Sequence, residues 1–272
     1  MTSRGPIRLF WAGGRSGEVN LGDTLSPVIV SALSGREVIY AKPAHADLVA
    51  IGSVFERVWR KRWRRLLSGR FAPLAVWGAG TLEEGAFPCD RRFAVSAVRG
   101  PATRDALGLP AGTPLGDPGL LAPEVLGVTR GEARAALGLI PHFTDQDHPA
   151  VARFAQEPGR RVIDVREPDL RATLRAVAEC EGVISTSLHG LIVADAMGVP
   201  NAWARLGDGV EGRGWKFQDY FASVGRETID PLSAHDLSNR ARVEAALVAA
   251  GRDQVAARIA DLRRSFAALS LT

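Results

Sequence analysis

Short apolar runs alternate with longer stretches of helical pattern along most of this chain, and no other feature limits the possible folds as strongly. The runs cover residues 7–11, 48–51, 74–77 and 93–98 in the first half, and 135–143, 160–165, 182–187 and 201–206 in the second. Each of the first four is followed by glycine and then by a turn or helix signal. Because strands that alternate with helices pair in parallel, the pattern predicts a layered α/β fold.

The chain has 272 residues, which suits about two domains at roughly 100 to 200 residues each. A segment rich in glycine and proline, residues 108–124, separates the two groups of runs, and we place a domain boundary at Pro123. We expect one α/β unit over residues 1–123 and a second over 124–230. Apolar residues at helical spacing predict that the tail, 231–272, is helical and packs back on the domains; they are Val255, Ile259, Leu262, Phe266 and Leu269.

The composition is that of a globular protein, with 46% hydrophobic and 24% charged residues. No apolar run approaches the roughly 18 to 20 residues that span a bilayer, and the first residues lack the pattern of a secretion signal. We therefore expect a cytoplasmic protein. Cys89 and Cys180 are far apart and show no metal-binding spacing, which favours reduced, structural cysteines.

The positive charge is concentrated in one segment, residues 57–70, which holds seven basic residues and no acidic one. A protein that coats nucleic acid spreads its charge more widely, so we expect no nucleic-acid partner. Trp59, Trp63, Leu66 and Leu67 recur at helical spacing among the arginines. The segment is typical of a helix that lies on an anionic membrane surface. The alternative is an ordinary surface helix whose Trp and Leu side chains face the core.

Polar residues and glycines gather at the ends of the predicted strands. Two α/β units in sequence leave a cleft between the carboxyl ends of their strands, where ligands of open sheets bind. The residues at these ends are Asn20, Asp23, Gly52, Ser53, Gly78, Gly80, Arg99 and His189. Their convergence predicts a binding site in this cleft.

His189 lies in the segment 182–200, where a buried strand turns into a helix that ends near Gly198. Free backbone N–H groups and the positive end of the helix dipole favour an anion at such a turn. A histidine beside a bound anion can transfer a proton. The alternative is that Ser185, Thr186 and Ser187 cap the helix and that His189 fills a polar gap.

Eight segments, taken together and in order, resemble the polysaccharide pyruvyl transferase family. They are NLGDTLSP (20–27), IGSVF (51–55), VWGAGTL (76–82), VRGPAT (98–103), LGDPGLL (115–121), IPHFTD (140–145), ISTSLHGLIVADAMGVP (184–200) and WKFQDYFASVG (215–225). The last is most similar to the branch that acts on succinoglycan- or xanthan-type exopolysaccharides. The resemblance implies two Rossmann-like domains that face each other across a cleft, as in GT-B glycosyltransferases, with the acceptor on the N-terminal side and the donor on the C-terminal side.

The resemblance implies transfer of pyruvate from phosphoenolpyruvate to two hydroxyls of a sugar in an exopolysaccharide or its lipid-linked precursor. A cyclic ketal forms and phosphate leaves. By position in the motifs, His189 is the general acid, Arg99 grips the donor and Leu188 lies beside it. Asp23 in the opposite domain is a candidate base, although it also suits a turn or a helix cap.

Further residues are expected to contact the substrates from the same strand ends. They are Ser187, Leu188 and Gly190 near the helix N-terminus, and Asn20, Ser53, Gly80, His142 and Asp117 around the cleft. A structural role for His142 is an equal alternative. The Asp-x-Asp pattern at 145–147 has no accompanying His or Cys cluster. The resemblance requires neither a metal nor a cofactor besides the phosphoenolpyruvate donor.

Two other functions are compatible with the sequence. A GT-B glycosyltransferase with a nucleotide-sugar donor shares the fold and the anion-binding helix. A scaffold without catalytic activity could bind glycan or a membrane-bound complex through residues 57–70, but it has no use for Arg99 and His189 as a proton-transfer site. A peripheral attachment to the inner face of the cytoplasmic membrane fits the leading function.

Overall fold

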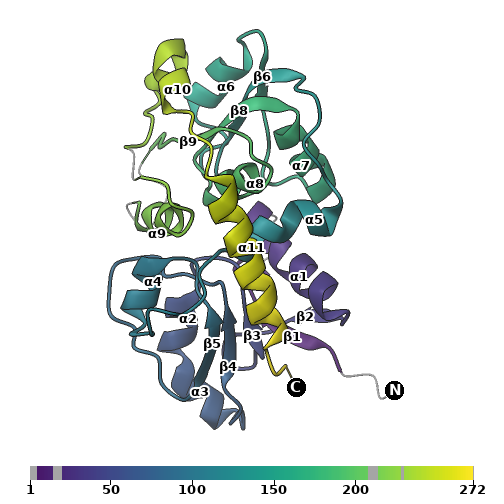
Figure 1. The fold of residues 1–272 in the computed structure, drawn as a ribbon, viewed down its shortest axis with the longest axis vertical. Coiled ribbons are helices and arrows are strands. Elements are labelled where there is room, and N and C mark those ends of the chain that lie inside the picture. Colours follow the sequence, from purple (N-terminus) through teal and green to yellow (C-terminus); the bar gives the residue numbers. More distant parts are fainter. Residues whose placement is uncertain (1–4, 15–19, 208–213, 228–229, 272) are drawn as a thin grey trace.

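The computed structural model describes residues 5–14, 20–207, 214–227 and 230–271, and it contains two sheets in which every strand pair is parallel. The first sheet has the order β2-β1-β3-β4-β5 and the second the order β7-β6-β8-β9. The sheets lie at opposite ends of the molecule (Figure 1). The predicted α/β fold is confirmed, whereas the closer likeness to GT-B enzymes stays a prediction.

The strands overlap the predicted apolar runs, and most of them are shorter than the runs. The strands are β1 (Ile7–Phe10), β2 (Val38–Tyr40), β3 (Leu48–Val49), β4 (Leu74–Trp77), β5 (Phe93–Ala97), β6 (Ala135–Ile140), β7 (Arg160–Val162), β8 (Cys180–Ser185) and β9 (Asn201–Trp203). Pairing in β6 ends at Ile140 and in β8 at Ser185, so the polar residues that follow are left in loops. The sequence analysis missed β2, a half-exposed strand of three residues at the sheet edge.

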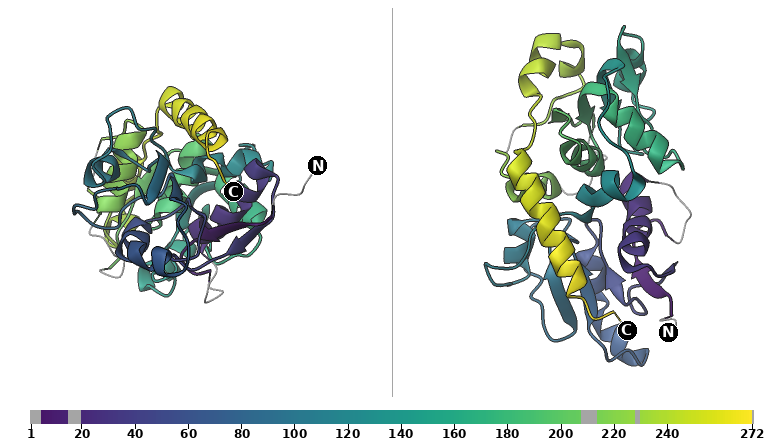
Figure 2. Two further views of the ribbon diagram at one scale, coloured as in Figure 1. Left: turned by 90° about the horizontal axis from the view of Figure 1, so that it is seen from below. Right: turned by 45° about the vertical axis from the view of Figure 1, so that its right-hand side comes forward.

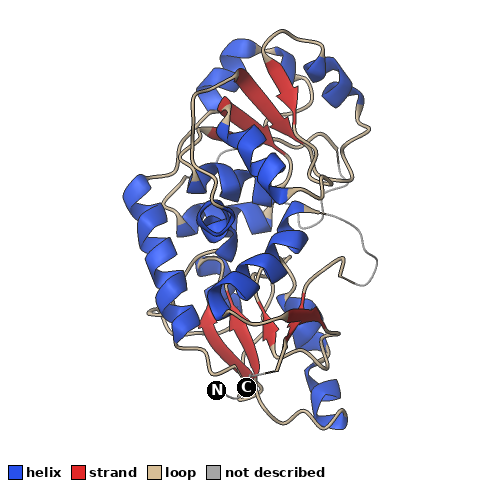
Figure 3. Ribbon diagram, turned by 90° about the vertical axis from the view of Figure 1, so that its right-hand side faces the viewer, coloured by secondary structure: helices blue, strands red, loops and turns tan. Residues whose placement is uncertain are grey.

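Helices connect the strands and fill the space between the two sheets (Figure 3). They are α1 (Leu21–Ser34), α2 (Phe55–Arg60), α3 (Arg62–Leu67), α4 (Pro101–Ala106), η1 (Pro118–Leu121), α5 (Ala122–Leu126), α6 (Pro149–Ala155), α7 (Leu170–Ala178), α8 (Leu188–Ala196), α9 (Trp215–Ser223), η2 (Asp236–Ser238), α10 (Arg240–Ala246) and α11 (Arg252–Ala267). The predicted boundary residue Pro123 lies inside α5, which contacts α1 as well as α7 and α8.

The C-terminal tail is helical, but it is not one continuous helix. Between α10 and α11 the chain is extended, and Val248 forms an antiparallel bridge to Asn201. The last helix, α11, runs from the second sheet down the side of the first (Figures 1 and 2). The indole Nε1 of Trp77 in β4 donates to the carbonyl of Leu262 at 3.0 Å and so fastens α11 to the first sheet.

One hydrophobic core extends through both halves of the molecule. It joins Leu25 of α1, Trp77 of β4, Leu121 of η1, Leu191 of α8 and Leu262 of α11, all fully buried. Two smaller clusters cover the far face of each sheet. Because side chains alternate along a strand, β4 serves both faces: Leu74 and Val76 belong to a far cluster, and Ala75 and Trp77 to the shared core. The loops at the strand ends are therefore held by one continuous packing unit.

Candidate active site

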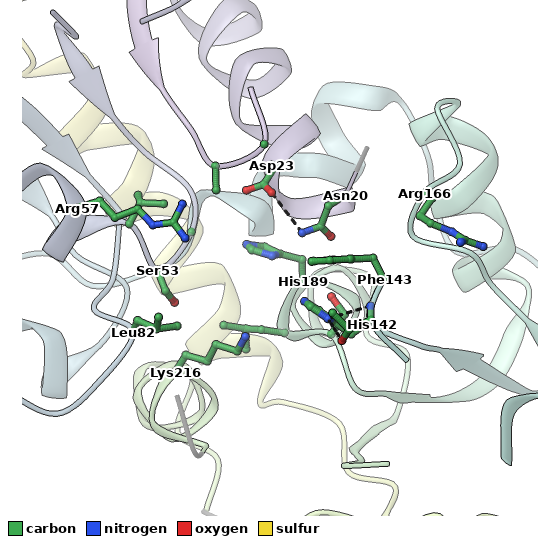
Figure 4. Close-up of a pocket in the computed structure, with 17 residues that line it drawn as sticks. Asn20, Asp23, Ser53, Arg57, Leu82, His142, Phe143, Arg166, His189 and Lys216 are labelled. Atoms are coloured by element: carbon green, nitrogen blue, oxygen red, sulfur yellow. Dashed lines mark hydrogen bonds between the residues drawn. The ribbon is translucent and has the colours of Figure 1, made fainter. Parts of the chain in front are cut away.

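A cleft of about 740 Å³ opens where the carboxyl ends of the strands of the two sheets meet (Figure 4). In each sheet the chain reverses its direction of progress between two central strands, β1 and β3 in the first and β6 and β8 in the second. Open α/β sheets bind ligands beside such a reversal. The loops after these four strands supply most of the lining: Ala12, Gly13, Asn20, Asp23, Gly52, Ser53, Val54, His142, Phe143, Thr144, Ser187, Leu188 and His189.

His189 occupies the centre of the cleft, in the first turn of α8, and its ring is held on two sides. On one side it lies against the backbone of α1, so close that a Cβ atom on Gly22 would lie 2.0 Å from Nδ1. On the other side Nε2 lies 3.8 Å from Oδ2 of Asp117. Both of these atoms are buried, and neither has a hydrogen-bond partner among the described residues. Nε2 therefore faces Asp117, while Nδ1 lies against Gly22 in the first turn of α1.

The environment moves the pKa values of this pair in opposite directions. Burial lowers the pKa of His189 to about 3, and the positive charges of Lys216 and Arg99 add to the effect. Burial raises the pKa of Asp117 to about 6, although the N–H of Gly119 and the charge of Arg99 oppose that rise. At neutral pH the imidazole of His189 is therefore neutral. A general acid here needs a bound anion to hold its proton.

The N-termini of α1 and α8 both reach the cleft without a capping side chain. Asn20 precedes α1 and Ser187 precedes α8, and neither makes a side-chain capping bond. Instead Ser185 Oγ accepts from the N–H of Ser187 at 3.0 Å, and Thr186 Oγ1 donates to Asp145 at 2.6 Å. The alternative that these three hydroxyls cap α8 is therefore wrong. The first N–H groups of a nine-residue helix remain available to an anion.

Arg99 is fully buried behind the wall of the cleft and is not among the lining residues. Its Nε donates to Asp219 Oδ2 at 3.0 Å, one terminal nitrogen donates to Ser53 Oγ at 2.6 Å, and the other to the carbonyl of Thr81 at 2.6 Å. Gly80 makes room for it, because a Cβ atom there would lie 2.2 Å from the guanidinium carbon. In this structure Arg99 joins the end of β5 to α9 and supports Ser53.

Three other cationic side chains line the cleft, and sequence reasoning assigned none of them to it. Arg57 of α2 and Lys216 of α9 lie on one side of His189, and Arg166 lies on the opposite side (Figure 4). Arg57 is exposed and has no ion pair with any described residue, whereas Arg166 pairs with Asp164 at 2.7 Å. The sequence contained a signal for Lys216, because this residue lies in the segment 215–225 that resembles the family. Arg57 was assigned to the basic segment 57–70 and not to the cleft.

Asn20 and Asp23 lie opposite His189, at the start of α1 (Figure 4). The side-chain amide of Asn20 donates to Asp23 Oδ2 at 3.3 Å, and Oδ1 of Asn20 is buried with no partner among the described residues. A ligand hydroxyl could satisfy this oxygen. The expected positions of both residues in the cleft are thus found.

The loop after β6 brings His142 and Phe143 into the cleft. Thr144 Oγ1 lies 2.8 Å from His142 Nδ1, and burial together with Lys216 lowers the pKa of His142 to about 4. Phe143, which the sequence analysis did not single out, is 44% exposed and packs against the ring of His142. Asp145 is buried and bonded to Thr186, so its carboxylate supports this loop.

Among the remaining predicted residues, Ser187 and Leu188 line the cleft, whereas Gly80, Asp117 and Gly190 lie behind its surface. Gly190 lies on the buried face of α8, where a Cβ atom would lie 2.5 Å from Ser185 Oγ. Within residues 5–14, 20–207, 214–227 and 230–271 no three His, Cys, Asp or Glu side chains gather as a metal-binding group.

Two parallel α/β sheets enclose a cleft with His189 at its centre and cationic side chains in its lining, a site that suits an anionic ligand. Comparison with known families is more specific. The chain belongs to the polysaccharide pyruvyl transferase family, whose family model matches residues 19–204. The predicted family is confirmed.

Two curated proteins are similar to this chain. The uncharacterized protein L143 of Acanthamoeba polyphaga mimivirus is 31% identical over 116 residues, 42% of this chain and 40% of that protein. The succinoglycan biosynthesis protein ExoV of Rhizobium meliloti (strain 1021) is 25% identical over 182 residues, 65% of this chain and 54% of that protein. The chain thus spans about half or less of the length of these relatives.

Proposed function

We propose that this protein transfers pyruvate from phosphoenolpyruvate to a sugar of a bacterial exopolysaccharide, or of its lipid-linked precursor, and forms a cyclic ketal. Family membership and the printed role of the Rhizobium relative in succinoglycan biosynthesis support the proposal. The observation that carries it is the position of His189, which faces Asp117 at the uncapped start of α8. We place the reaction in the cytoplasm.

The donor binds between α8 and the cations on one side of His189. The N–H groups of Leu188, His189 and Gly190 bind one anionic group of phosphoenolpyruvate, because the helix start provides both donors and a positive dipole. Arg57 and Lys216 bind the other anionic group from the facing wall. Arg99 acts as a positioning residue in this arrangement, since its hydrogen bonds fix Ser53 and the helix that carries Lys216.

His189 protonates the methylene carbon of the bound donor. The negative charges of phosphoenolpyruvate raise the low pKa of His189, so that the ring takes up a proton where it is needed. The carboxylate of Asp117 stabilises the imidazolium from the Nε2 side and helps to fix the orientation of the ring. The central carbon then resembles an oxocarbenium ion.

Two sugar hydroxyls attack this carbon in turn. The first forms one C–O bond, phosphate leaves as its own C–O bond breaks, and the second hydroxyl closes the ketal ring. Of the two hydroxyl protons, one replaces the proton that His189 gave to the methylene carbon, and the other leaves with phosphate. Asp23 is the proposed base for the attack, and Asn20 orients the sugar through its unpartnered Oδ1.

Phosphate release from phosphoenolpyruvate tests the proposal directly. Wild-type protein, His189→Ala and a matched control, His235→Ala at an exposed site, are incubated with free and lipid-linked oligosaccharides. We expect phosphate release that depends on acceptor, with the mass gain of pyruvate on the glycan, in the wild type and control only. No release across a broad acceptor panel, with turnover of a nucleotide sugar instead, would identify the protein as a glycosyltransferase.

A further inference from the structure

An apolar tip projects from the end of the first sheet that is farthest from the second sheet (Figures 1 and 3). We call this surface the α3 tip. It consists of Trp63, Leu66, Leu67 and Phe71, whose exposed fractions are 54%, 37%, 89% and 79%. The described residues include seven exposed large hydrophobic side chains, and four of them are in this stretch of nine positions. Such a concentration indicates a contact surface.

The segment 57–70 was predicted to form one amphipathic helix, but in the structure its helical part belongs to two short helices, α2 and α3. The chain turns at Lys61, between α2 and α3. Trp59 points inward, where its Nε1 donates to the carbonyl of Pro88 at 3.1 Å. Arg65 is buried and donates to the carbonyls of Ala46 at 2.6 Å and Ala72 at 3.0 Å. Both residues therefore anchor the segment.

The cations that remain outside surround the apolar tip. Arg60, Lys61 and Arg64 are exposed, and none forms an ion pair with a described residue. The guanidinium of Arg92 lies 3.5 Å from the ring centroid of Trp63 and holds that side chain in position. The nearby carboxylates are engaged elsewhere: Asp47 pairs with Arg8 and Arg70, and Asp90 with Arg92. The tip thus presents apolar side chains within a ring of positive charge.

We infer that the α3 tip docks the protein on an anionic lipid surface. Leu67 and Phe71 enter the boundary between headgroups and acyl chains, and Trp63 lies at headgroup level with the basic side chains on the lipid phosphates. The positive charge around the apolar residues favours an anionic lipid surface as the occupant. A partner protein that covered only the apolar residues would leave Arg60, Lys61 and Arg64 without opposite charges.

The orientation leaves the cleft open. Phe71 lies three positions before β4 begins, at the amino end of the strands, whereas the cleft lies at their carboxyl ends. The helices α2 and α3 lie between the cleft and the α3 tip. They cover residues 55–67, which is roughly 20 Å of chain at the helical rise per residue. No helix in the described part of the chain is long and apolar enough to cross a bilayer.

Vesicle flotation with the full chain tests the inference without reference to enzymatic activity. We expect binding to vesicles that contain phosphatidylglycerol, weaker binding at high salt, and little binding to phosphatidylcholine alone. Arg60→Glu with Arg64→Glu should weaken binding by at least about 30-fold. Leu67→Ser with Phe71→Ser should weaken it by about 10-fold or more. The matched control is Arg171→Glu with Arg175→Glu, an exposed pair with the same spacing on α7.

Trp63 reports the depth of the contact. Lipids brominated on their acyl chains should quench part of the tryptophan fluorescence of the wild type, and the quenching should fall in Trp63→Phe. Unchanged unfolding curves would show that the variants are folded. Absence of wild-type binding to anionic vesicles, or equal losses in the tip variants and the α7 control, would overturn the inference. A dimer that dissociates only in the tip variants, without vesicle binding, would assign the tip to a second copy of the chain.

Discussion

Nε2 of His189 and Oδ2 of Asp117 lie 3.8 Å apart, and neither has a hydrogen-bond partner among the described residues. The distance is too long for a hydrogen bond and short enough for a strong electrostatic interaction once one group changes charge. A bound anion would complete this dyad by raising the pKa of the histidine, so that the ring takes up a proton beside Asp117.

Replacement of Asp117 by Asn should stabilise the protein and inactivate it. The folded-state pKa of Asp117, about 6, lies above the ordinary value of 3.8, so ionisation of the carboxylate lowers stability as pH rises from 4 to 6. We expect Asp117→Asn to gain about 2 to 3 kcal/mol at pH 7.5, because one unit of pKa shift corresponds to about 1.4 kcal/mol. Urea unfolding at pH 4 and at pH 7.5 measures this gain in the free energy of unfolding. An equal gain at pH 4 would show that the ionisation is not the cause.

The imidazole of His189 should remain neutral far below the ordinary histidine range. Its folded-state pKa of about 3 lies below the ordinary value of 6.5, so its contribution to stability is complete above pH 6.5 and is lost as pH falls toward 3. Ring resonances in NMR measure this pKa. Phosphoenolpyruvate should raise the pKa of His189. A normal His189 titration without ligand would contradict the burial argument.

Gly22→Ala should impair catalysis without unfolding the protein. The new Cβ atom would lie 2.0 Å from Nδ1 of His189, so the ring must move. We expect a fall in kcat/KM on the order of 100-fold, since a displacement of about 1 Å has that effect in active sites. Gly112→Ala, where no atom lies within 4 Å of the added Cβ, is the control and should keep its activity. Similar activity in both variants would mean that the ring position is not critical.

The Arg99–Asp219 ion pair should be essential for folding stability. Both side chains are fully buried, and removal of one leaves the other charge without its partner. We expect Asp219→Asn to cost about 3 to 5 kcal/mol in the free energy of unfolding. Asp105→Asn removes the exposed partner of Arg104 and should cost less than about 1 kcal/mol. Denaturant titrations compare the free energies of unfolding of the two variants. Equal losses would show that burial does not make the Arg99–Asp219 pair more important for stability than the exposed pair.

The sequence predicted those parts of the site that depend on strand ends. Asn20, Ser53, His142 and His189 follow strands of parallel sheets, and parallel strands bring their carboxyl ends to one edge. The segment 182–200 also predicted the helix start correctly, because an apolar β-branched run and a terminal glycine fix both of its ends. Local pattern was sufficient wherever one strand and one turn decide where a side chain points.

Contacts between distant segments could not be predicted in this way. Arg99 was expected at the donor, but its partner Asp219 is 120 positions away, and only the packing of α9 against α4 shows that the arginine is buried. The pairing of His189 with Asp117 depends in the same way on η1 packing against α8. The turn at Lys61 was not predicted either. It goes with the burial of Arg65, whose hydrogen bonds to the carbonyls of Ala46 and Ala72 join segments that a periodicity within residues 57–70 does not show.

The single core beneath the cleft has a consequence for how the chain folds. Leu25 of α1 belongs to the first half of the sequence, yet it is buried in the same cluster as Leu191 of α8. A polypeptide cut near residue 127 would expose that cluster on both pieces, so neither piece should fold in isolation. Mixed together, the two pieces should reassemble and recover the wild-type circular dichroism, because each supplies the apolar surface that the other lacks.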